Sequence, residues 1–385
     1  MSVTAPAGFR AAGVTAGLKP SGKPDVALVV NDGPRHDAAA VFTANRCKAN
    51  PVLWSERAIV DGRLDAVVLN SGGANCYNGP EGFQTTHASA ELVAELIGGG
   101  AFDVAVCSTG LIGQLLDRAL LEKGIRAAAG ALSGDGGQAA AEAIMTTDTR
   151  PKQATVQGDG WVIGGMAKGA GMLAPALATM LVVITTDAVV DPPVLDVALR
   201  AATGSTFDRL DTDGCMSTND TVVVMASGAS GVHADQPELT AALTAVCADL
   251  ARQLWSDAEG SHHDIEIEVV GAAADGEALE VGRAVARSNL FKAAVFGGDP
   301  NWGRVLAAVG TTTARFEPED IDIAMNGVVV CRSGGTKTAA SASEVDLSGR
   351  SVHVRIDLGA GAASATILTS DLTHDYVHEN SAYST

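Results

Sequence analysis

A loop of small residues that runs directly into an apolar, β-branched segment constrains this chain more than any other feature. Residues 168–187 have the sequence KGAGMLAPALATMLVVITTD. Glycine costs backbone entropy in a helix, and proline lacks a donor and clashes with the preceding turn, so the first part of this stretch is predicted to be a loop. The run from Met180 to Thr185 then predicts a buried strand. Thr179 lies at the junction between the two.

A threonine at this junction has the layout that a self-activated nucleophile requires. Its hydroxyl is a weak nucleophile at neutral pH, so a positioned base must remove the proton during attack. If the bond before Thr179 is cut, the freed α-amino group lies beside the hydroxyl, and such a group titrates at about 7.7–8.0 and can serve as that base. The alternative interpretation is that Thr179 only begins a strand, as β-branched residues often do.

The segment KGAGMLAPALATML closely resembles the self-cleaving motif of the ornithine acetyltransferase (ArgJ) family, the glutamate N-acetyltransferases of arginine biosynthesis. Three further segments resemble the same family in the same order: CSTGLIG at 107–113, MTTDT at 145–149 and ENSAYST at 379–385. The resemblance implies a layered α/β (α+β) sandwich of the N-terminal-nucleophile-like type with a second, smaller α/β lobe. It also implies cleavage between Ala178 and Thr179, with the chains 1–178 and 179–385 folding as one unit.

The family's activity, by resemblance, is transfer of the acetyl group from N2-acetyl-L-ornithine to L-glutamate through an acetyl-threonine intermediate. Thr179 matches the nucleophile, and Thr109 and Gly110 match the pair that stabilises the oxyanion. The substrate contacts that the resemblance implies, besides Thr179, are Thr146, Thr147, Lys168, Glu259, Asn380 and Thr385. No nucleotide, metal or organic cofactor is implied, and the sequence does not separate the roles of the two adjacent threonines.

The chain departs from the family just after Glu259 and Gly260. The family commonly has a small residue, a threonine and a lysine there, whereas this chain has Ser261, His262, His263 and Asp264. The departure leaves open how substrate carboxylates are neutralised and how Glu259 is oriented. The adjacent histidines do not indicate a metal site, because neighbours on an extended segment point to opposite faces and no cysteine or H-x-x-x-H partner accompanies them.

Composition excludes several other classes of function. The chain has 26 basic and 45 acidic residues, a formal net charge of −19 and no basic block, which disfavours binding to nucleic acid or an anionic membrane. The six cysteines are scattered and predicted to be reduced. The first residues lack the features of a signal peptide, and no apolar stretch is long enough to span a membrane, so a cytoplasmic location is expected.

Apolar runs alternate with helical patterns, which predicts α/β or α+β organisation in a chain of 385 residues. Strands are expected over 38–43, 66–70, 104–108, 221–225 and 265–270, with a hairpin over 154–165 and a meander over 321–332, 352–358 and 363–369. Helices are expected over 83–97, 115–132, 236–255 and 282–294. The acidic segment 210–221 misses the spacing of a calcium loop and is predicted to be a buried polar turn.

Two other functions remain compatible with the pattern. An N-terminal-nucleophile aminopeptidase or amidohydrolase would use the same threonine but give the acyl group to water. A non-catalytic ligand-binding protein would keep the chain uncut. The resemblance also suggests two copies of each half in the assembly, and it leaves open whether acetyl-CoA serves as a second acetyl donor.

Overall fold

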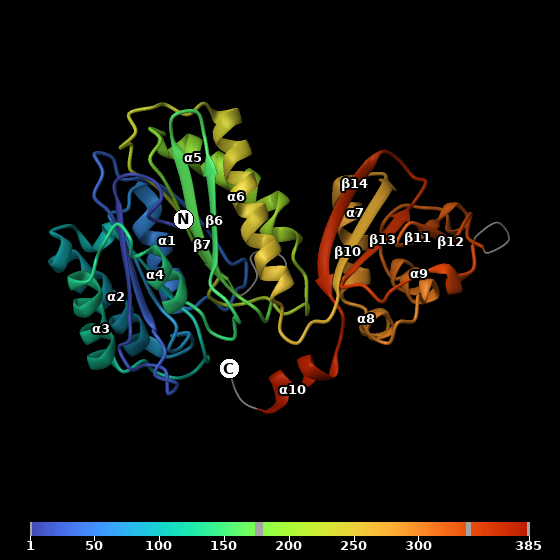
Figure 1. Cartoon of the computed structure of the whole chain (residues 1–385), viewed down its shortest axis with the longest axis horizontal. Helices are drawn as coiled ribbons and strands as arrows, with labels where there is room; N and C mark the ends of the chain where they lie inside the picture. Colours follow the sequence, from blue (N-terminus) through green and yellow to red (C-terminus); the bar gives the residue numbers. More distant parts are fainter. Residues whose placement is uncertain (1, 174–179, 336–339, 383–385) are drawn as a thin grey trace.

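The computed structural model describes residues 2–173, 180–335 and 340–382, and the strands within these ranges form three sheets (Figure 1). The first sheet has the order β1-β2-β4-β5, with strands Phe9–Val14, Val26–Asn31, Ala66–Asn70 and Val104–Ser108. The second has the order β3-β9-β8-β7-β6, with strands Asp37–Phe42, Thr221–Ala226, Leu181–Thr186, Val162–Lys168 and Lys152–Gln157. These two sheets make up the larger lobe.

Helices cover the outer faces of the two sheets. The helices α1 (Asn50–Ala58), α2 (Gly79–Ile97) and α3 (Arg118–Gly130) pack on the first sheet. The helices α5 (Pro192–Ser205) and α6 (Gln236–Ser256) pack on the second, and the short α4 (Gly137–Ala143) contacts both sheets. The larger lobe is therefore a sandwich of helix, sheet, sheet and helix layers, as Figure 1 shows.

The position of strand β8 explains why the sequence after Thr179 is an unbroken apolar run. Its residues Leu181 and Val183 face the core between the two sheets, whereas Val182 and Ile184 face the core beneath α5 and α6. All four side chains are buried because each face of the strand is covered. The run that follows Thr179 in the sequence is therefore a central strand of the second sheet, as predicted.

The smaller lobe is built on the third sheet, whose order is β12-β11-β13-β10-β14. Its strands are β10 (Asp264–Ala272), β11 (Asp322–Met325), β12 (Val328–Cys331), β13 (Ser351–Asp357) and β14 (Ala363–Ser370). Its helices are α7 (Asp275–Ala286), α8 (Asn289–Phe296) and α9 (Trp302–Val309). The last helix, α10 (His374–Ala382), leaves this lobe and runs back toward the larger one (Figure 1).

The predicted α/β fold with a second, smaller lobe is confirmed, but two local predictions were wrong. The helix expected over 282–294 is two helices. The first, α7, ends at Ala286, and Ser288 caps α8 by accepting a hydrogen bond from the Phe291 amide. The expected meander is interrupted, because β10 pairs in parallel with β13 and separates it from β14.

Candidate active site

Thr109 and Gly110 follow β5, where the first sheet meets the loops of the second. The Thr109 amide donates to the Asn70 carbonyl at 3.0 Å. Gly110 has a φ of +131°, and a Cβ atom added there would lie 2.8 Å from the Gly73 Cα atom. Only glycine fits this close approach of two backbones. The Asn219 side chain donates to the Ser108 carbonyl at 2.8 Å and so ties this turn to the loop that precedes β9.

Lys168 ends β7 with its side chain buried. Its Nζ atom donates to the Thr146 Oγ1 atom at 2.9 Å. Burial lowers the pKa of Lys168 more than the nearby carboxyl of Asp148 raises it. A buried ammonium with one hydroxyl partner retains hydrogen-bonding capacity for an anion.

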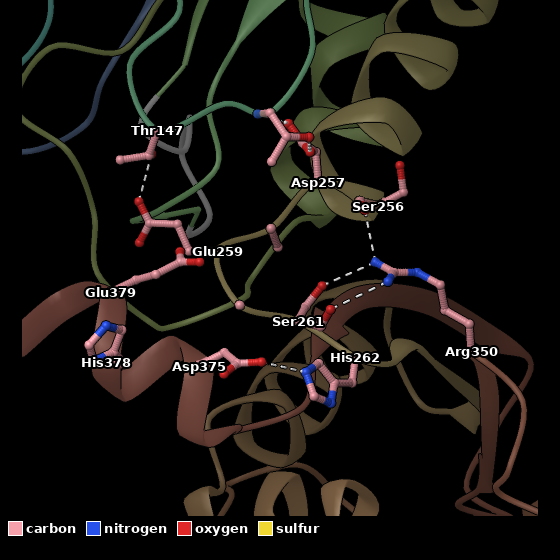
Figure 2. Close-up of a pocket in the computed structure, with 13 residues that line it drawn as sticks. Thr147, Ser256, Asp257, Glu259, Ser261, His262, Arg350, Asp375, His378 and Glu379 are labelled. Carbon is pink, nitrogen blue, oxygen red and sulfur yellow. Dashed lines mark hydrogen bonds and ion pairs between the residues drawn. The ribbon is translucent and has the colours of Figure 1, made fainter. Parts of the chain in front are cut away.

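Glu259 lies on the opposite side of the same turn, in the segment that follows α6. Its Oε1 atom accepts a hydrogen bond from the Thr147 hydroxyl at 2.7 Å, which Figure 2 shows. Its Oε2 atom accepts from the Asn380 side chain on α10 at 3.1 Å. The two adjacent threonines therefore have different partners: Thr146 contacts the ammonium of Lys168, and Thr147 contacts the carboxylate of Glu259. A Cβ atom at Gly171 would lie 2.4 Å from Glu259, so this glycine leaves room for the carboxylate.

These side chains line one small cavity of about 100 Å³, which we call the inner cavity. All seven predicted site residues that fall within the described ranges line it. They are Thr109, Gly110, Thr146, Thr147, Lys168, Glu259 and Asn380. The remaining three, Ala178, Thr179 and Thr385, lie outside the described residues. Met180, the residue after Thr179, directly precedes β8. The first residue of β8, Leu181, pairs with Lys168.

A buried ion cluster holds the turn of the inner cavity in place. The Lys152 ammonium donates to Asp148 and to Asp257, each at 2.6 Å. Asp148 also accepts from the Gly169 amide at 2.7 Å and from the Thr146 amide at 2.9 Å. Although burial raises the pKa of Asp148, the positive charges of Lys168 and Lys152 lower it below its ordinary value. Sequence analysis missed this cluster, because a lysine near a strand end resembles a solvated surface charge.

One of the residues in which the chain departs from the family, His262, contacts the C-terminal helix. The His262 Nε2 atom lies 2.8 Å from an Asp375 carboxylate oxygen on α10, and Arg350 donates to the Ser261 carbonyl and hydroxyl (Figure 2). His263 contacts Asp371 at 2.7 Å. A second cavity of about 410 Å³, which shares Thr147 and Glu259 with the inner cavity, is lined by Ser261, His262, Arg350 and Asp375 among others. Glu259 itself stays directed at Thr147.

None of the helices in residues 2–173, 180–335 and 340–382 is long and apolar enough to cross a membrane. Within the same ranges, no group of three or more histidine, cysteine, aspartate or glutamate side chains is arranged to hold a metal ion.

The layered fold and the inner cavity together define an α/β enzyme whose site presents a buried ammonium and a carboxylate to a small polar substrate. Comparison with known proteins makes the assignment specific. The ArgJ family model matches residues 10–385. The arginine biosynthesis bifunctional proteins ArgJ of Streptomyces coelicolor and Thermobifida fusca are 61% and 60% identical, each covering 100% of both chains. The chain belongs to the ArgJ family.

A solved structure of a similar protein is that of ornithine acetyltransferase complexed with ornithine from Mycobacterium tuberculosis. It is 54% identical, covers 47% of this chain and 96% of its own, and has a TM-score of 0.45. The predicted family is confirmed by the sequence relatives, and with it the predicted class of enzyme, an acetyltransferase of arginine biosynthesis.

The buried ion cluster around Lys152 should contribute strongly to the stability of the fold. Replacing Lys152 by methionine leaves Asp148 and Asp257 buried without their cation, and we expect the free energy of unfolding to fall by about 3–5 kcal/mol. The matched control is Lys48→Met, which removes only the partly exposed ion pair with Glu56 and should cost less than about 1 kcal/mol. Urea unfolding of both variants measures the difference. Equal losses in the two would contradict a structural role for the cluster.

Proposed function

We propose that this protein transfers the acetyl group from N2-acetyl-L-ornithine to L-glutamate through an acetyl ester of Thr179, after it has cut its own chain before that residue. The observation that supports the proposal is the convergence of seven predicted residues on the inner cavity. Three loops from distant parts of the sequence, the end of β7 and the C-terminal helix supply them. The similar protein solved with ornithine is consistent with this choice of substrate.

The proposed self-cleavage begins with attack of the Thr179 hydroxyl on the Ala178 carbonyl carbon. A C–O bond forms, the C–N bond to Thr179 breaks, and water then hydrolyses the ester to give the chains 1–178 and 179–385. Strand pairing in the second sheet supports the proposal that the chains 1–178 and 179–385 stay together after cleavage. Its strands β3, β7 and β6 precede the junction whereas β8 and β9 follow it, and β8 pairs with β7 and β9 pairs with β3.

In the proposed transfer, the Thr179 hydroxyl attacks the acetyl carbonyl of N2-acetyl-L-ornithine. The freed α-amino group of Thr179 takes the hydroxyl proton and passes it to the departing ornithine amine. Thr109 and Gly110 stabilise the oxyanion of the tetrahedral intermediate, a contribution of roughly 3 kcal/mol for each well-placed donor. L-Glutamate then binds in the same cavity, and its amine takes the acetyl group from the threonine ester.

The inner cavity offers complementary partners for both amino acids. We assign the substrate α-carboxylate to Lys168 and Thr146, since a buried ammonium is the group that neutralises such an anion. Glu259, oriented by Thr147 and Asn380, is suited to hold an ammonium group. Thr385 is an additional proposed contact, which the family resemblance implies.

Intact mass under denaturing conditions tests the self-cleavage. The wild-type protein should give two chains, 1–178 and 179–385, and Thr179→Ala should stay whole because it has no hydroxyl. A folded, uncut wild-type chain would exclude the free-amine mechanism.

An acetyl-exchange assay tests the reaction itself. Isotopically labelled acetyl from N2-acetyl-L-ornithine should appear on Thr179 in the absence of glutamate and on glutamate when it is added, with the parallel-line kinetics of a ping-pong cycle. Release of free acetate at the same rate with and without glutamate would instead indicate a hydrolase.

The Gly110 turn gives a prediction for the oxyanion site. Gly110→Ala forces the added methyl group against Gly73 and moves the turn, so kcat for acetyl transfer should fall roughly 10²–10³-fold. The control is Gly113→Ala in the same loop, where φ is also positive but a Cβ atom meets nothing within 4 Å. A similar loss of kcat in both variants would show that backbone strain alone, not the position of Gly110, is responsible.

Asn380 gives a prediction for the C-terminal helix. Asn380→Ala removes a hydrogen bond to Glu259 from a helix without buried residues, so activity should fall while the melting temperature stays nearly unchanged. Steady-state kinetics and thermal unfolding measure the two quantities. Replacing Val377, an exposed residue of the same helix, by alanine provides the control. Equal activities of Asn380→Ala and wild type would remove Asn380 from the site.

A further inference from the structure

One buried carboxyl, Asp371, joins the segment that leads into α10 to the turn that follows Glu259. Its Oδ1 atom accepts hydrogen bonds from the His262 and His263 amides, each at 3.0 Å. Its Oδ2 atom lies 2.7 Å from the His263 Nδ1 atom. The Asp371 side chain is fully buried, and that of His263 is 14% exposed. We call these contacts of Asp371 with His262 and His263 the helix clamp.

A further contact between the same two segments fixes the start of α10. The Thr373 hydroxyl donates to the Gly260 carbonyl at 2.6 Å and accepts from the Tyr376 amide at 2.9 Å. Gly260 has a φ of +58°, and a Cβ atom added there would lie 2.2 Å from the Tyr376 nitrogen. The helix therefore begins directly against the turn that carries Glu259.

The other end of α10 reaches the inner cavity. Asn380 donates to the Glu259 Oε2 atom at 3.1 Å. The helix has no buried residue over its described length, His374–Ala382, so packing along it contributes little to its position. At the rise of an α-helix, Asn380 lies roughly 10 Å along the axis from Thr373. A small tilt at the helix clamp therefore moves the Asn380 amide out of hydrogen-bonding distance.

The His263 ring has a hydrogen-bond acceptor at each of its nitrogen atoms. Nδ1 faces the Asp371 carboxylate, and Nε2 lies 3.1 Å from the Leu347 carbonyl oxygen. A neutral imidazole carries one N–H group, whereas an imidazolium carries two. Both contacts are therefore hydrogen bonds only when the ring is charged. Loss of a proton turns one of them into a contact between two acceptors.

Two other cations lie near the helix clamp, and each has a partner of its own. Lys292 of α8 donates to a backbone carbonyl, and Arg350 forms an ion pair with Asp264 of β10 at 2.9 Å. Burial lowers the pKa of Lys292 more than the nearby carboxyls, Asp371 among them, raise it. Among the described residues, the His263 ring is the cationic group within hydrogen-bonding distance of Asp371.

The neighbouring histidine makes a similar contact in a different environment. The His262 Nε2 atom lies 2.8 Å from Asp375 of α10, but the two side chains are 50% and 63% exposed (Figure 2). Solvent screens such a pair, and exposed ion pairs contribute little to stability. A change of charge at His262 should therefore affect the position of α10 much less than a change at His263.

We propose that His263 is a positioning residue for the acetyl exchange. Its charged ring holds Asp371 at the start of the C-terminal helix, and the helix in turn places Asn380 against Glu259. The inference rests on the proposed function, in which these last two residues contact substrate. Histidine changes its charge between about pH 5 and 8. The Asn380 contact is complete while the ring is charged and weakens as the pH rises through this range.

Two variants separate the charge of this side chain from its shape. His263→Lys keeps a cation throughout the range of about pH 5 to 8, and His263→Asn keeps only a neutral donor. The ratio of wild-type kcat/KM to that of His263→Lys should fall about tenfold from the acidic to the alkaline end of this range. The ratio to His263→Asn should fall by the same factor. Titration of other groups in the site cancels in both ratios.

The Asn380→Ala background distinguishes positioning from a general structural role. At the acidic end of the range, His263→Asn should lower kcat/KM about tenfold in the otherwise wild-type protein. It should change kcat/KM by less than about twofold in Asn380→Ala, because the contact that it positions is already absent. The matched control is His262→Gln, which removes the exposed pair and should stay within about twofold of wild type at every pH.

Hydrogen exchange of the α10 amides follows the helix clamp without an activity assay. At each pH, protection in wild type should match that of His263→Lys at the acidic end and that of His263→Asn at the alkaline end. Should His263→Lys not fold, the ratio to His263→Asn alone carries the test.

The outcomes are distinct. An active wild type whose ratios to the variants stay constant with pH would overturn the positioning role and leave the proposed function in place. Equal losses from His263→Asn with and without Asn380 would overturn it as well. A wild type without acetyl exchange at any pH would overturn the proposed function, and the positioning role with it.

Discussion

The buried ammonium of Lys152 fixes the geometry on which the inner cavity depends. Removing a lysine and two carboxylates from water is costly, and the cost is recovered only when every charge finds partners. Here Asp148 holds the Thr146 and Gly169 amides, and Asp257 holds Thr149, so one cation joins three backbone segments. The side chains that contact substrate in the proposed reaction are placed by this cluster, although none of its members lines the inner cavity.

The pairing of β7 with β8 is compatible with the proposed cut, because it holds strands from both sides of the junction together. Lys168, the last residue of β7, lies opposite Leu181, the first of β8, so β7 ends where β8 begins. A cut there removes a connection but no sheet hydrogen bond. In the second sheet, β9 and β8 lie between β3 on one side and β7 and β6 on the other, and neither half has a complete core without the other.

Much of this arrangement could be predicted from the sequence, and the exceptions have physical causes. The strands β4 and β5 agree with their predicted bounds because both are unbroken apolar runs. The strand β1 escaped prediction, since its alanine and glycine carry little β propensity. The strand β2 was also not predicted, although its sequence VALVVN is a typical buried strand. Lys152 and Asp257 are 105 positions apart, and no local pattern reveals such a pair. The different contacts of Thr146 and Thr147 could not be predicted from the sequence either, because adjacent identical residues differ only in what each one faces.

In the proposed exchange one cavity accepts amino acids whose side chains carry opposite charges, and the two threonines provide a basis for this. Thr146 contacts the ammonium of Lys168 and Thr147 contacts the carboxylate of Glu259, so a positive and a negative partner lie on either side of one turn. A chain with a net charge of −19 repels an anionic substrate at long range, which makes the local cation necessary for glutamate. Lys19 adds to this positive side: it donates to the Met145 carbonyl, and although burial lowers its pKa to about 8, it stays mostly charged at neutral pH. The overall charge then favours ornithine's ammonium, the local cations favour the carboxylates, and the same cavity serves both halves of the proposed exchange.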